Sequence, residues 1–152
     1  GIDHPLVTRR INMTLENNDV HFLVRAKKIL RTNEWLPILN HFYNQKTQAF
    51  MDNNFDKVSD YIYWGHLIAN AIDYDQYRQS HHWKDLRTRT LDKYKNCIVC
   101  SRPSEDMHHN RYHGVLFKEQ VGVDVVAMCR CCHTKFHNDN KVANYYELKR
   151  TN

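Results

Sequence analysis

Residues 97–137 decide the fold, and their sequence is CIVCSRPSEDMHHNRYHGVLFKEQVGVDVVAMCRCCHTKFH. It contains two CxxC pairs, a His-His pair between them and two further histidines after the second CxxC. The eight residues concerned are Cys97, Cys100, His108, His109, Cys129, Cys132, His133 and His137. Four cysteines can hold one structural ion, and the histidines beside them can build a second metal site. This combination predicts two metal sites within one short segment.

The cysteine spacing predicts a structural zinc site. Zinc bound by thiolates prefers four tetrahedral ligands, and each CxxC turn presents two sulfurs, so Cys97 and Cys100 with Cys129 and Cys132 complete one site. The ion would replace apolar core that so small a unit lacks. Two disulfides are the alternative, which an intracellular setting disfavours. The spacing of Cys131 fits neither pair, so we expect a free thiol there.

The histidine spacing predicts a second metal site and a separate base. His133 and His137 are four residues apart and share one face of a helix, and His108 can supply a third ligand from a neighbouring strand. His109 follows directly, so on a strand its side chain points the other way. It is therefore free to act as a base. Asp106 shares the strand face of His108, and we expect it to orient that ligand.

Apolar residues recur at helical spacing before the metal motif. The predicted helices there cover residues 22–31, 36–50, 58–72 and 75–93. We expect Asn33 and Asp56 to cap the second and third helices, with Pro37 in the first turn of the second. After the first CxxC, alternation and β-branched residues predict two strands and then two helices. These elements cover residues 106–111, 123–128, 130–138 and 142–148.

The positive charge of the chain lies with the metal motif. Residues 1–74 contain eight basic and eight acidic residues, whereas residues 75–152 contain fourteen and nine and account for the formal net charge of +5. A polymer rich in phosphate is the natural partner for such a segment, and plain solubility is the alternative. No apolar run in this sequence is long enough to span a membrane, and we expect no secretory signal. We therefore expect a cytoplasmic (intracellular) protein with no membrane partner.

The segment over residues 77–137 resembles the HNH endonucleases of the ββα-metal type that contain a zinc knuckle. The matching pieces are YRQSHHWKDLRTRTL, CIVC, MHHNRYH, DVVAMCRCCH and the final FH. The resemblance implies a ββα-metal HNH unit with a four-cysteine zinc site. The apolar stripes before it, which the resemblance does not cover, add the expectation of an α+β, mostly helical protein whose N-terminal helices pack on this C-terminal unit. Residues 1–74 would form the helical N-terminal region. Residues 75–152 would form the nuclease domain with its lead-in helix.

The resemblance also implies a role for individual residues. His109 matches the general base of the family, and His108 matches the metal ligand before it. His133 matches the helical ligand at the end of the motif, and His137 matches an additional ligand of members related to bacterial nuclease toxins. Asp124 stands where the family usually has the asparagine that braces the loop and orients the base. An aspartate accepts the same hydrogen bonds but cannot donate as an amide does.

The function that we expect is that of a DNA endonuclease or nickase with one catalytic divalent ion, which could be Mg²⁺, Mn²⁺, Ni²⁺ or Zn²⁺, and His109 as base. The alternative is a non-catalytic zinc-stabilised module that binds nucleic acid or another protein. Double-stranded DNA is the expected partner; a homodimer and a protein partner of the N-terminal helices stay open. Arg111 is either a phosphate contact or a solvated surface residue. Further candidates for contacts to the DNA backbone are Lys84, Arg87, Arg89 and Lys135.

Overall fold

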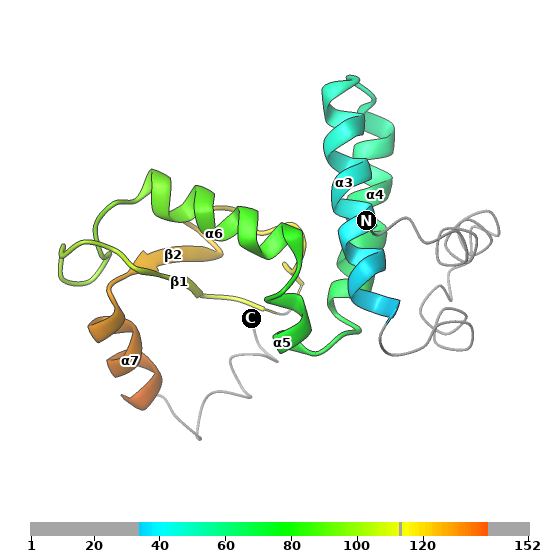
Figure 1. Cartoon of the computed structure of the whole chain (residues 1–152). Coiled ribbons are helices and arrows are strands. Elements are labelled where there is room, and N and C mark those ends of the chain that lie inside the picture. Colours follow the sequence, from blue (N-terminus) through cyan, green and yellow to red (C-terminus); the bar gives the residue numbers. More distant parts are fainter. Residues whose placement is uncertain (1–33, 113, 140–152) are drawn as a thin grey trace. The chain divides into compact units, whose positions relative to one another are not determined.

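The computed structural model describes residues 34–112 and 114–139 of the chain. Figure 1 shows its elements in the order α3 (Trp35–Met51), α4 (Phe55–Ala69), α5 (Tyr74–Tyr77), α6 (His81–Lys93), β1 (Asp106–His109), β2 (Val125–Met128) and α7 (Arg130–Asp139). The mostly helical α+β class is confirmed, because β1 and β2 form a two-stranded antiparallel sheet. The chain divides into two units between His82 and Trp83, beyond the boundary predicted after residue 74. Within the described ranges no helix combines the length and apolar character needed to cross a membrane.

The first unit contains a helical hairpin in which α3 and α4 lie side by side (Figure 1). The apolar stripe predicted for α3 is buried only in part: Ile38, Leu39 and Phe42 are at most 1% exposed, whereas Phe50 at its far end is 63% exposed. Ile68 gives α4 a fully buried position as well. Each such side chain contributes roughly 1.5–3 kcal/mol when it is fully buried. The turn between the helices passes through Asn53, whose φ of 57° is one that asparagine adopts more readily than most residues.

The two predicted N-caps of this hairpin are wrong. Glu34 is the N-cap of α3 and makes no side-chain capping bond, and Asn33 lies outside the described residues. The N-cap of α4 is Asn54, whose side chain accepts a hydrogen bond from the Lys57 backbone N–H at 3.4 Å. Asp56 instead lies in the first turn of α4, where its charge complements the helix dipole.

The single helix predicted over residues 75–93 is divided into α5 and α6. Asp73 begins α5 by accepting from the Gln76 backbone N–H at 2.9 Å. The first turn of α6 obtains its partner from another helix, because the His81 backbone N–H donates to Asn40 Oδ1 of α3 at 2.8 Å. A tertiary hydrogen bond therefore replaces the partner that a continuous helix would supply, and the chain turns at Ser80, which is fully buried.

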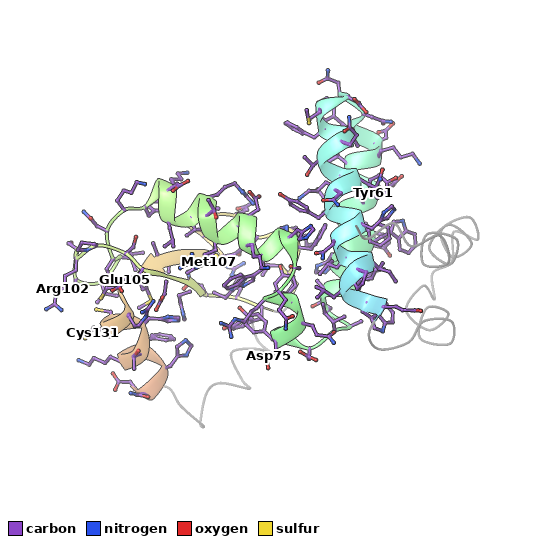
Figure 2. All side chains as sticks on the ribbon, in the orientation of Figure 1. Tyr61, Asp75, Arg102, Glu105, Met107 and Cys131 are labelled. Carbon is purple, nitrogen blue, oxygen red and sulfur yellow. The ribbon has the colours of Figure 1, made fainter. Side chains whose placement is uncertain are left out.

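The second unit is built on the β1–β2 hairpin, in which His108 pairs with Val126 and His109 with Val125. Leu86 of α6 packs on this sheet in a buried cluster with Met107 and Val125. The sulfur of Met107, which is labelled in Figure 2, also accepts a hydrogen bond from the Thr90 hydroxyl of α6. Both strands are shorter than predicted, ending at His109 and beginning at Val125. The chain turns before Val125 at Gly122, whose φ of +90° is available to glycine at little cost.

Helix α7 follows β2 almost directly and contacts β1, which completes a ββα arrangement. It covers the helix predicted over residues 130–138 and extends to Asp139. The helices predicted over residues 22–31 and 142–148 lie outside the described residues.

Candidate metal centres

The structure brings the four cysteines of the two CxxC pairs into one group, here called the cysteine cluster. The Sγ atoms of Cys97, Cys100, Cys129 and Cys132 all lie within 4.8 Å of one another. Within the group, Cys100 Sγ and Cys129 Sγ are 3.6 Å apart. Backbone N–H groups point at the sulfurs, from Val99 to Cys97 Sγ at 3.4 Å and from Cys132 to Cys129 Sγ at 3.3 Å. Such N–H groups favour the thiolate form that binds metal.

The acid–base properties of the cysteine cluster indicate a need for a cation. Burial tends to raise the pKa of Cys97, but backbone N–H groups of Cys129, Cys100 and Val99 outweigh it and lower that pKa to about 6. Hydrogen bonds with the Cys129 and Cys100 side chains raise the pKa of Cys132 to about 12. Four neighbouring sulfurs cannot all ionise without a compensating positive charge. A tetrahedral ion with affinity for sulfur supplies that charge, so the cluster can hold a metal ion such as zinc.

Apolar side chains pack around the cysteine cluster. Val126 and Met128 of β2 are buried there, and Phe136 of α7 packs against them. Cys131, labelled in Figure 2, is exposed on α7 and does not belong to the cluster. Its side chain is therefore separate from the four sulfurs, as its spacing predicted.

A second group, here called the His triad, consists of His108, His133 and His137, each with a ring nitrogen within 4.8 Å of the others. His108 comes from β1, and the other two lie one turn apart on α7. The Nε2 atoms of His133 and His137 face each other at 2.9 Å. The His108 ring lies 5.3 Å from that of His133 and 5.5 Å from that of His137, measured between centroids. The triad can hold a metal ion.

The protonation state of the His triad suits metal binding. Burial, together with His133, His137 and His109 nearby, lowers the pKa of His108 to about 4. Burial and the adjacent His133 also lower the pKa of His137. These imidazoles are thus held neutral, which is the form that binds a metal. His108 Nδ1 is buried and has no hydrogen-bond partner among the described residues, a deficit that a bound ion at this ring would help to offset.

Asp106 orients a different histidine from the one predicted. Its Oδ2 lies 3.1 Å from Nδ1 of His133, and its Oδ1 accepts from Arg130 Nη2 at 3.1 Å. Burial tends to raise the pKa of Asp106, but hydrogen bonds from Arg130 and His133 lower it below its usual value. The carboxylate therefore fixes the His133 ring with Nε2 directed towards the partner on the next turn.

Replacing Asp106 with asparagine is expected to weaken divalent-metal binding at the His triad by about 10- to 100-fold, because orienting partners of metal ligands commonly contribute that much. Isothermal titration of Ni²⁺ into zinc-loaded protein measures the change. Glu105→Gln is the matched control, since its carboxylate accepts from the Arg130 backbone N–H at 3.3 Å and is not placed at the triad. Equal Ni²⁺ affinity for Asp106→Asn and the wild type would contradict the assignment.

His109 lies apart from the His triad and is buried with an acidic partner. Its Nε2 is 2.8 Å from Glu119 Oε2, and the two side chains are 1% and 0% exposed. The ring also stacks on Tyr112, with centroids 5.3 Å apart and planes inclined by 16°. Sequence reasoning missed Glu119, which lies in the loop between β1 and β2. The only signal for it was the apolar pair Leu116 and Phe117 just before it, which is buried and draws this loop inward.

Asp124 braces the loop between β1 and β2. Its buried carboxylate accepts from the Gln120 backbone N–H at 2.8 Å, and its backbone carbonyl accepts from the Asn110 N–H at 2.7 Å. The Arg111 Nε lies 3.9 Å from Asp124 Oδ1. The Nε2 atom of His109 is paired with Glu119 and not with this aspartate.

Two of the predicted DNA-contact residues on α6 form polar contacts with other residues of the protein. Arg87 Nη2 donates to the Glu105 backbone carbonyl at 2.9 Å, which ties α6 to the segment before β1. Arg89 forms an ion pair with Asp85 at 2.9 Å, one turn away on the same helix.

The other three predicted DNA-contact residues are exposed. Arg111 follows β1 with a side chain that is 56% exposed. Lys84 lies on α6 and Lys135 on α7, both at the surface. All three belong to the second unit.

Comparisons with models of known protein families, with curated proteins and with solved structures find no match to this chain.

Proposed function

We propose that this protein is a metal-dependent DNA endonuclease or nickase of the HNH type, with a ββα-metal core stabilised by zinc. The observation that carries the proposal is the pairing of two environments on β1. His108 belongs to the metal-competent His triad, whereas the next residue, His109, is paired with Glu119. A metal site with an adjacent, unligated imidazole is what a single-metal hydrolysis of phosphodiesters requires.

In the proposed reaction, His109 takes a proton from a water molecule as its oxygen attacks the scissile phosphorus. The new P–O bond forms as the bond to the leaving 3′-oxygen breaks. A divalent ion, when bound by the His triad, supplies Lewis-acid stabilisation of the negative charge on the phosphate and leaving oxygen. Because the His109 side chain is 1% exposed, the proposal requires the loop after β1 to admit a water molecule to the ring when DNA binds.

The charge of the second half of the chain supports a nucleic-acid substrate. Residues 75–152 account for the net charge of +5. Arg111, Lys84 and Lys135 are exposed there and are our candidates for contacts to DNA phosphates. Contacts of this kind position the duplex without reading its sequence.

Incubation of supercoiled plasmid with the protein and Mg²⁺, Mn²⁺ or Ni²⁺ tests the proposal. We expect nicked or linear DNA with at least one of these ions and intact plasmid in EDTA. His137→Ala should lose cleavage while it keeps its zinc, because that residue belongs to the His triad and not to the cysteine cluster. DNA binding without cleavage under every ion would contradict the proposal in favour of a zinc-stabilised binding module.

A further inference from the structure

We infer that Glu119 is a positioning residue that fixes the ring tautomer of His109, so that Nδ1 is the atom that accepts the proton. This role rests on the proposed function, in which His109 is the base. The inference concerns a residue outside both metal clusters.

The contact between the two side chains defines the tautomer. The distance from His109 Nε2 to Glu119 Oε2 is 2.8 Å, and the two side chains are almost completely buried. A carboxylate accepts hydrogen bonds and has none to donate, so Nε2 carries the hydrogen. In a neutral imidazole the other nitrogen, Nδ1, then keeps the lone pair. A base with a fixed tautomer does not lose part of its population to the unreactive form.

The position of Glu119 is itself fixed by the loop around it. The next residue, Gln120, donates its backbone N–H to the Asp124 carboxylate at 2.8 Å and accepts from the Asp124 N–H at 2.9 Å. On the other side, Phe117 is 1% exposed and anchors the chain in the interior. Asp124 therefore helps to hold Glu119, and through Glu119 the His109 ring, in position. This role requires only that the side chain of Asp124 accept hydrogen bonds, which a carboxylate does.

Tyr112 constrains the His109 ring in a second direction. The two rings stack at 5.3 Å with planes only 16° apart. The hydrogen bond to Glu119 directs the Nε2 edge of the ring, and the stacking sets the plane of the ring. Two perpendicular constraints hold a side chain more firmly than one.

The charge of Glu119 also favours the reaction itself. As Nδ1 takes a proton from water, positive charge develops on the imidazole next to the carboxylate. An acidic partner that holds a catalytic histidine and stabilises its developing charge can account for a factor of about 10⁴ in rate. Glu119→Gln keeps the size of the side chain but removes this charge and can present an amide donor to the ring. We therefore expect kcat to fall by at least about 100-fold, with KM for DNA changed by less than about threefold.

The experiment combines kinetics with nitrogen NMR on the zinc-loaded full chain labelled with ¹⁵N-histidine. In the wild type at mildly alkaline pH we expect the long-range ¹H–¹⁵N pattern of a neutral His109 with hydrogen on Nε2. In Glu119→Gln we expect that pattern to be lost or mixed and kcat to fall as stated. Asp92→Asn is the matched control, because this carboxylate is 72% exposed on α6. Zinc content and the backbone amide spectrum confirm that each variant is folded.

The possible failures are distinguishable. A wild-type His109 with hydrogen on Nδ1 would overturn the tautomer assignment even if Glu119→Gln did not fold. Cleavage by folded Glu119→Gln at the wild-type kcat would overturn the role of Glu119 and leave the nuclease proposal standing. A wild type that cleaves no DNA would overturn the nuclease proposal, and the role of Glu119 in catalysis with it.

Discussion

Replacing His109 with alanine is expected to slow DNA cleavage by about 100- to 10,000-fold, the usual contribution of a general base. The reason is that the other three histidines of the motif form the His triad, and His109 is directed instead towards Glu119. Initial rates of plasmid nicking at saturating metal measure the effect. DNA affinity should remain close to that of the wild type, because the variant retains every lysine and arginine.

His81→Ala is the matched control for this experiment. His81 is an exposed histidine at the start of α6, and only its backbone N–H is used in the bond to Asn40. We expect it to cleave as the wild type does. Zinc content and metal affinity should be unchanged in His109→Ala. If that variant cut DNA at the wild-type rate, the base assignment would be wrong whatever the activity of the protein.

Replacing Cys129 with serine is expected to unfold the second unit and release its structural ion. Small zinc-folded peptides gain roughly 10–16 kcal/mol of apparent free energy from the ion, which exceeds the stability of many whole domains at roughly 5–15 kcal/mol. The sheet here has only four residues in each strand. We expect zinc to be absent in native mass spectrometry and the NMR signals of β1 and β2 to collapse towards random-coil positions.

Cys131→Ser is the control that the chain itself provides. Cys131 is exposed, lies between Cys129 and Cys132 in sequence and does not belong to the cysteine cluster. The control should keep one zinc ion and the wild-type spectrum. Loss of zinc from Cys131→Ser, with zinc retained by Cys129→Ser, would show that the second pair of ligands is misassigned.

The sequence was sufficient to predict the structure where the contacts that determine it are between residues close in sequence. The grouping of His133 and His137 follows from helical spacing, and the CxxC turns bring their own sulfurs together. The apolar stripe of α3 is also a local property, and its first part is buried at Ile38, Leu39 and Phe42, although Phe50 at its far end is exposed. In each case the residues concerned lie within a few positions of one another, so the geometry of one turn or helix decides the result.

Prediction from the sequence failed where a residue distant in the sequence determines the structure. The break between α5 and α6 depends on Asn40, which lies 41 positions before the residue it binds. Asp106 shares a strand face with His108, yet the position of α7 places His133 within its reach. Glu119 is a lone acidic residue in a loop, without periodicity or a spaced partner. Its contact with His109 exists only because the loop folds inward and buries both side chains.

The adjacency of Cys132 and His133 on α7 has a consequence for how the protein would respond to metal supply. One peptide bond separates a member of the cysteine cluster from a member of the His triad, and the His133 N–H is bonded to the Cys129 carbonyl at 3.0 Å. Occupancy of either cluster stabilises the same turn of helix. By thermodynamic linkage, an ion in one cluster would raise the affinity of the other for its own ion by the same factor. Scarcity of zinc would then weaken metal binding at the His triad as well, even with Mg²⁺ or Mn²⁺ in excess.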